Sequence, residues 1–203
     1  MTIKLKEAAQ KKIDSPDDIF GIMQKILLRE NKIDRNREHF WTISLDTAKK
    51  ILNIELVSMG SINQTIVEPM EVLSVPLQKR AANIILVHNH PSGELIPSEA
   101  DKDITDRLIQ CGLIMHVPVI DHLIITEKTY YSFLTSGLLK ELEASTKYVP
   151  SYVLANRMRK QMEEKIRMTE KSLMAKVMKE NGEPIEKIAK YTGLSKKAIK
   201  LLQ

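Results

Sequence analysis

The sequence predicts an α/β fold built around one sheet, followed by a helical extension. Between residues 16 and 137, short apolar runs typical of strands alternate with segments of helical periodicity. One run, residues 83–90, is apolar over most of its length, as expected of a central strand buried on both faces. After Pro150 the pattern is helical to the end of the chain. Interleaved strands and helices of this kind favour a sheet covered by helices.

The boundaries of the elements follow from local signals. Ser15 and Pro16 begin a helix as capping residue and first helical residue. Ser98 and Asp101 form a variant of the capping box, and Gly112 marks the expected end of that helix. We expect helices at residues 16–29, 69–82 and 98–112, and strands at residues 38–45, 51–59, 65–67, 83–90 and 117–125.

Charge divides the chain into two parts. Residues 1–150 hold 18 Lys and Arg against 20 Asp and Glu, whereas residues 151–203 hold 13 against 6, a net of +7. This excess indicates an anionic partner for the tail, although a solvated helix surface would have the same composition. The expected organisation is a lead at 1–14, an α/β domain at 15–137, a linker at 138–150 and a basic helical tail at 151–203.

Composition excludes several classes of protein. The apolar runs are about five residues long, far below the roughly 20 that a membrane-spanning helix needs, so we expect no membrane association. No apolar segment follows the charged N-terminus, and a single cysteine cannot form an internal disulfide. These features predict a cytoplasmic protein. Aromatic residues make up only 4%, which argues against a stacking platform for single-stranded nucleic acid.

Two histidines end the buried strand. His88 and His90 are two residues apart, so their imidazoles lie on the same face. A short loop leads to the next helix, where Asp101 in the first turn offers a carboxylate oxygen. Two imidazoles and one carboxylate form a catalytic type of zinc site, with the fourth position left to water. A histidine pair by itself is more often packing than metal, but the following turn, capping Ser98 and Asp101 make the pattern more specific.

These residues resemble the RadC branch of the JAB/MPN (JAMM) metalloproteins over residues 15–137. The resemblance rests on the run from His88 to Gly93 and on Pro97-Ser98-x-x-Asp101. Further matches are Glu38-His39-Phe40, Leu45-Asp46, Gly60-Ser61-Ile62-Asn63, Glu71-Val72, Ala81-Ala82-x-Ile84-Ile85 and Asp121-His122-Leu123-Ile124-Ile125. It implies the JAB/MPN fold, similar to that of cytidine deaminases, with a mixed sheet and zinc at its edge.

The resemblance also implies roles for individual residues. The zinc ligands would be His88, His90 and Asp101. Glu38 matches the family's general base, and Glu71 is the alternative. Ser98 would steady the oxyanion, or serve only as the helix cap. Independently of the resemblance, the place of Asp121 and His122 in a strand allows one of them to accept a hydrogen bond from a ligand imidazole, or both to form a satisfied polar pair near the sheet edge.

The chain departs from the family pattern in two places. RadC proteins usually carry an N-terminal helix-hairpin-helix region, and the 14 residues before this domain are too few for one. Met70 replaces an arginine that is common before the position of Glu71. The family's historical link to DNA repair is therefore weak support for a repair role.

The function expected is a zinc-dependent hydrolase that cleaves an amide or isopeptide bond. Zinc would lower the pKa of a water, and Glu38 would take its proton and pass it to the leaving amine. The substrate would be a peptide or isopeptide, and phosphodiester chemistry stays open. The alternative is a DNA-associated accessory protein of a mobile element in which the metal site is structural or vestigial.

The tail allows two further interpretations. Residues 184–203 resemble the helix-turn-helix segments found at the ends of mobile-element proteins, with three lysines on a short second helix that would contact DNA phosphates: Lys196, Lys197 and Lys200. Packing or self-association is the other explanation of this segment. Half of the ten methionines lie in residues 151–180 at helical spacing, so a homo-oligomer formed through that stretch is expected as a further alternative.

Overall fold

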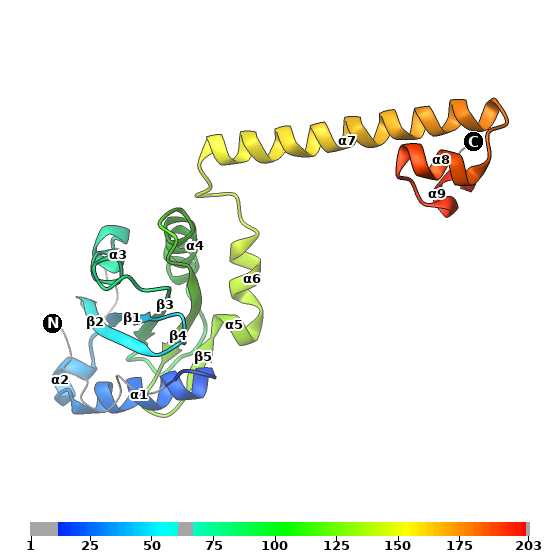
Figure 1. Cartoon of the computed structure of the whole chain (residues 1–203). Coiled ribbons are helices and arrows are strands. Elements are labelled where there is room, and N and C mark those ends of the chain that lie inside the picture. Colours follow the sequence, from blue (N-terminus) through cyan, green and yellow to red (C-terminus); the bar gives the residue numbers. More distant parts are fainter. Residues whose placement is uncertain (1–11, 61–66, 202–203) are drawn as a thin grey trace. The chain divides into compact units, whose positions relative to one another are not determined.

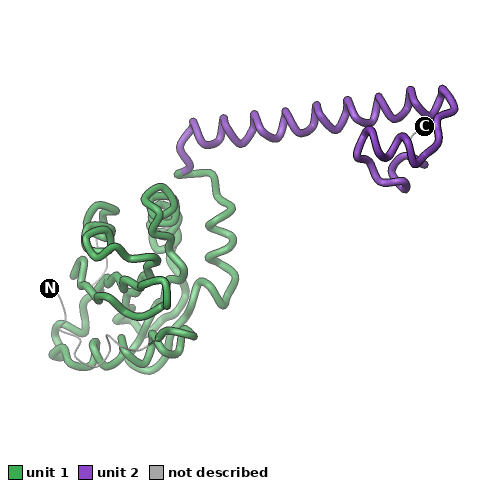
Figure 2. The backbone as a smooth tube through the Cα atoms, in the orientation of Figure 1, with its two compact units in different colours: residues 1–148 green, residues 149–203 purple. Residues whose placement is uncertain are grey.

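The computed structural model describes residues 12–60 and 67–201, which form two compact units, residues 1–148 and 149–203 (Figures 1 and 2). The first unit contains α1 (Pro16–Arg29), α2 (Lys32–Arg35), β1 (His39–Leu45), β2 (Ile51–Met59), α3 (Pro69–Gln78), β3 (Asn83–Asn89), α4 (Glu99–Ile114), β4 (Val119–Ile125), β5 (Tyr130–Ser132), α5 (Phe133–Ser136) and α6 (Leu138–Glu143). The second contains α7 (Ser151–Glu180), α8 (Ile185–Thr192) and α9 (Lys196–Leu201).

The five strands form one mixed sheet in the order β2-β1-β3-β4-β5. Strand β1 runs antiparallel to both β2 and β3, β3 runs parallel to β4, and β5 returns antiparallel to β4. The predicted α/β fold with a mixed sheet is therefore confirmed. Strand β3 is central, which explains its continuous apolar run, and its C-terminal end carries the two histidines.

Helices cover both faces of the sheet (Figure 1). On one face, α1 packs its apolar side on alternate residues of β1, including Trp41 and Ile43. On the other face, α3, α4 and α5 pack around Phe40, Leu86 and neighbouring residues. The helix α1 begins as predicted with a capping box: the Ser15 hydroxyl oxygen accepts from the backbone N–H of Asp18, and the Asp18 carboxylate accepts from the backbone N–H of Ser15. The two layers together fix the start of α4 beside the end of β3.

Helix α4 continues two residues beyond its predicted end. Gly112 lies inside the helix, and a Cβ at this position would come within 2.6 Å of the carbonyl oxygen of Val117. The glycine therefore permits a close backbone approach and does not end the helix. The turn is made instead by His116, which adopts a φ of 57°.

Residues 138–148 differ from the expected linker, because they are folded as part of the first unit. Helix α6 covers residues 138–143, and Leu139 is buried in the cluster beneath α4 and α5. The hydroxyl of Tyr148 binds the carboxylate of Asp103. The predicted helix at 69–82 ends earlier, at Gln78. Within the predicted strand at 65–67, residues 65–66 lie outside the described residues and Val67 belongs to no strand.

The second unit is a long helix that packs two short helices at its C-terminal end (Figure 2). Its small core consists of Ala175, Ile188, Leu194 and Ile199. The turn between α8 and α9 starts at Gly193, whose φ of 71° is left-handed and suits a residue without a side chain. Across both described ranges, we find no helix with the length and apolarity required to cross a bilayer.

Candidate metal centre

The C-terminal end of β3 holds the two histidines on one face of the sheet. His88 is buried in the strand and lies parallel to the ring of Phe40, its partner on β1, at a centroid distance of 6.2 Å. His90 follows the strand, and its backbone N–H still donates to the carbonyl of Ile125 on β4 at 3.0 Å. Their Nε2 atoms lie only 2.9 Å apart.

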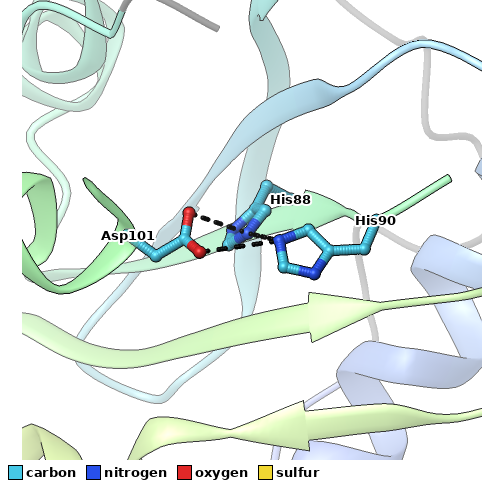
Figure 3. A group of neighbouring side chains, drawn as sticks. All are labelled: His88, His90 and Asp101. Atoms are coloured by element: carbon cyan, nitrogen blue, oxygen red, sulfur yellow. Dashed lines mark hydrogen bonds and ion pairs between the residues drawn. The ribbon is translucent and has the colours of Figure 1, made fainter. Parts of the chain in front are cut away.

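Asp101 completes the group from the first turn of α4 (Figure 3). Its Oδ1 lies 3.2 Å from Nε2 of His88, and its Oδ2 lies 3.5 Å from Nε2 of His90. The capping box with Ser98 fixes the carboxylate, because the Ser98 backbone N–H and hydroxyl both donate to Oδ2, at 2.7 and 2.6 Å. The predicted helix cap at Ser98 is thus confirmed.

Hydrogen bonds on the far side of each ring set the tautomers of both histidines. Nδ1 of His90 lies 2.8 Å from the carbonyl oxygen of Glu94, which can only accept, so Nδ1 carries the proton. Nδ1 of His88 lies 2.7 Å from Nε2 of His122, and Nδ1 of His122 lies 2.6 Å from the hydroxyl of Thr105.

The Thr105 hydroxyl orients this chain of bonds. It donates its one proton to the backbone carbonyl of Asp101, so it must accept a proton from Nδ1 of His122. His122 then accepts from Nδ1 of His88 through its own Nε2. Burial lowers the pKa of His122 well below its ordinary value, which keeps this imidazole neutral and able to accept.

As a result, the Nε2 lone pairs of His88 and His90 point toward each other and toward a carboxylate. Two lone pairs and a negative charge this close repel one another unless a cation lies between them. Among the described residues, these three are the group whose donor atoms lie together, all within 4.8 Å. The arrangement therefore suits a metal ion.

A cleft of about 420 Å³ opens onto the three residues and includes Glu38. Glu38 precedes β1, and burial raises the pKa of its carboxyl group. Glu71, the other predicted candidate base, is exposed on α3 and is not one of the described residues that line the cleft. The structure thus brings Glu38 to the three residues.

Asn89 holds the backbone on both sides of Glu38. Its buried side chain accepts from the N–H of His39 at 2.7 Å and donates to the carbonyl of Arg37 at 3.0 Å. These bonds fix the backbone that leads into β1, and with it the position from which the Glu38 side chain projects.

The sequence analysis did not single out Asn89 or Thr105 as site residues. The available signals were the place of Asn89 between two histidines and that of Thr105 one helical turn after Asp101. Of the two residues considered as partners of a ligand imidazole, His122 contacts His88. Asp121 instead accepts from the Ser132 hydroxyl.

Comparison with known proteins agrees with this geometry. The family model of the RadC-like JAB domain matches residues 13–138. Relatives named "UPF0758 protein" include one from Flavobacterium johnsoniae, 44% identical over 128 residues, and one from Methanosarcina mazei, 40% identical over 134 residues. These alignments cover 63% and 66% of this chain, and the chain spans about half the length of the relatives, 54% and 56%. The chain belongs to the RadC-like JAB domain family.

Proposed function

We propose that the protein is a metal-dependent hydrolase that cleaves an amide or isopeptide bond with an activated water molecule. The observation that supports this most directly is the convergence of two imidazole lone pairs and an ionised carboxylate in an open cleft beside Glu38. Three protein ligands leave a coordination position for water, which is typical of catalytic rather than structural metal sites.

His88, His90 and Asp101 would hold the ion, and zinc suits this donor set. Around a tetrahedral zinc ion, donors about 2.0–2.1 Å from the metal lie roughly 3.3 Å from one another. The two Nε2 atoms lie 2.9 Å apart, Oδ1 of Asp101 lies 3.2 Å from Nε2 of His88, and Oδ2 lies 3.5 Å from Nε2 of His90, so each of these separations is near that value. When bound, zinc supplies a Lewis acid that lowers the pKa of a water to about 7.

Glu38 would act as the general base. It takes the proton of the attacking water and returns it to the leaving amine, so that the amine departs neutral. Burial favours this role because it raises the pKa of the carboxyl group and makes its carboxylate a better proton acceptor. Ser98 is a weaker candidate for the oxyanion, since its hydroxyl proton is already donated to Asp101.

The test compares Glu38→Gln with Glu71→Gln, a matched change outside the cleft. Metal content is measured by mass spectrometry, and zinc-loaded protein is screened against peptide, isopeptide and phosphodiester substrates. Glu38→Gln should keep about one zinc per chain and lower turnover about 10²–10⁴-fold, while Glu71→Gln should have little effect. Loss of activity only with Glu71→Gln would refute the assignment of the base.

The alternative function, a DNA-associated accessory protein, has a different signature. Zinc-loaded protein that hydrolyses none of these substrates but binds DNA would favour it. Turnover of a phosphodiester instead of a peptide would keep the metal centre but change the substrate class.

A specific observation in the second unit supports DNA contact as an additional function. Helices α8 and α9 are joined by a three-residue turn, the arrangement of a helix-turn-helix. Lys197 and Lys200 are exposed on α9, and in the described part of the chain neither side chain has a carboxylate partner within 4.0 Å. The second helix of such a motif enters the major groove, where these lysines would meet phosphates.

The test uses the full chain, a 20-base-pair duplex and fluorescence anisotropy over a range of salt. The double variant Lys197→Glu, Lys200→Glu should bind more weakly and flatten the slope of log affinity against log salt by about 2. The control, Arg157→Glu with Lys160→Glu, changes the net charge equally on α7. Equal losses in both variants would show that α9 is not the contact.

A further inference from the structure

Helix α7 carries an exposed apolar stripe with no partner among the described residues of its own unit. The helix has 30 residues, about 45 Å at 1.5 Å per residue, yet only Ala175 is buried. We define the α7 stripe as five large apolar residues that are 47–68% exposed: Met158, Met162, Ile166, Leu173 and Val177. At about 100° per residue, these side chains fall on one side of the helix.

The stripe lies away from the surface that α7 uses inside its own unit. Ala175 and Met178 pack against α8 and α9, and they project about 150° around the helix from the middle of the stripe. The stripe is therefore a second apolar face. A long helix with two apolar faces, one of them exposed, is typical of a helix that packs against a further partner.

We propose that the partner is α7 of a second copy of this chain, and that the two helices pair in parallel as a short coiled coil. The a and d positions of such a seam are separated alternately by three and four residues. The stripe follows this spacing through Met162, Ile166, Thr169 and Leu173, with steps of four, three and four residues.

The charges beside the stripe select both the partner and its direction. Glu163 and Glu170 lie on one side, seven residues apart, and Lys165 lies on the other. In a parallel pair, the side of one helix that carries Lys165 meets the side of the partner helix that carries the glutamates. Lys165 of each helix therefore faces Glu170 of the partner, a position five residues further along the sequence. In an antiparallel pair, like sides meet and Glu163 would face Glu170, which is repulsive. The surface is therefore complementary to itself in the parallel direction.

The first experiment is analytical ultracentrifugation of the full chain between about 1 and 100 μM. Wild type should show a concentration-dependent dimer, and Met162→Glu should raise its dissociation constant at least tenfold. Met168→Glu is the matched control, because Met168 is about half exposed on the same helix but projects away from the stripe. A monomer throughout this range, or equal weakening by both variants, would overturn the proposal.

The second experiment tests direction by disulfide formation in a Cys111→Ser background, which removes the native cysteine. A parallel pair places position 162 opposite position 162, so Met162→Cys alone should cross-link under mild oxidation. An antiparallel pair centred on the stripe would separate these positions by roughly 16 Å, beyond the about 7 Å that a disulfide spans, and would cross-link only a mixture of Met162→Cys and Leu173→Cys chains. Cross-linking of that mixture alone would refute the parallel arrangement.

Discussion

Replacing Thr105 with valine should weaken both the fold and the metal affinity of the site, although Thr105 touches no proposed ligand side chain. Its hydroxyl donates to the carbonyl of Asp101 at 2.5 Å and accepts from Nδ1 of His122 at 2.6 Å. Thr105 and His122 are both fully buried, so water cannot replace the lost partner. Valine keeps the shape of the side chain, which isolates the effect of the hydroxyl.

The magnitude follows from the groups that lose a partner. A buried donor left without an acceptor, here Nδ1 of His122, costs about 1–3 kcal/mol. The lost bond to the Asp101 carbonyl adds about 0.5–1.5 kcal/mol, so the free energy of unfolding should fall by about 1.5–4.5 kcal/mol. If His122 changes tautomer instead, Nε2 of His88 becomes protonated and loses its lone pair. Metal affinity should therefore fall about 10–100-fold.

Two measurements check this prediction, with Thr42→Val as the control. Urea denaturation of metal-free protein gives the stability change, and competition with a chromophoric chelator gives the zinc affinity. Thr42 is also buried, but its hydroxyl has no partner among the described residues. Removing that hydroxyl should leave the stability unchanged or raise it by up to about 1–3 kcal/mol, with no effect on zinc.

The reasoning would be refuted by a Thr105→Val protein that unfolds within about 0.5 kcal/mol of wild type and binds zinc equally well. A fall in stability with unchanged zinc affinity would show that the hydroxyl supports the fold but does not set the tautomers of the histidines.

The remaining predictions concern the fold. Gly112→Ala should lower the free energy of unfolding by about 1–3 kcal/mol, because its Cβ would meet the Val117 carbonyl at 2.6 Å. Gly21→Ala should raise it by about 0.5–1 kcal/mol, because that helical position has open space; thermal unfolding measures both. Burial and the hydrogen bond to Asp17 raise the pKa of Tyr130 to about 12. The folded state therefore holds the phenol proton more tightly than the unfolded state, and this contribution to the free energy of unfolding is present below pH 10 and lost as the pH rises from about 10 to about 12. Alkaline absorbance titration should show one tyrosine ionising late, and Asp17→Asn should lower its pKa toward the ordinary value.

Local sequence signals were sufficient where the structure depends on near neighbours. The capping boxes at Ser15 and Ser98 are satisfied within three residues, so their side chains announce the helix starts directly. The spacing of His88 and His90 fixes their common face through the two-residue period of a strand. Gly112 was misread because its neighbour, the Val117 carbonyl, is brought close by a turn that the glycine signal does not describe.

By itself, the sequence determined the mixed α/β class, the family and the three residues that meet at the end of β3, because periodicity, capping and short motifs are local properties. Only the tertiary structure decided that Glu38 lines the cleft while Glu71 does not, and that His122 and Thr105 set the tautomers behind His88. The two hydrogen bonds of His122 join residues 17 and 34 positions apart, and Glu38 lies 50 to 63 positions from the three residues. Their geometry depends on strand order and register. No local pattern encodes that geometry, since it arises only when β1, β3, β4 and α4 pack together.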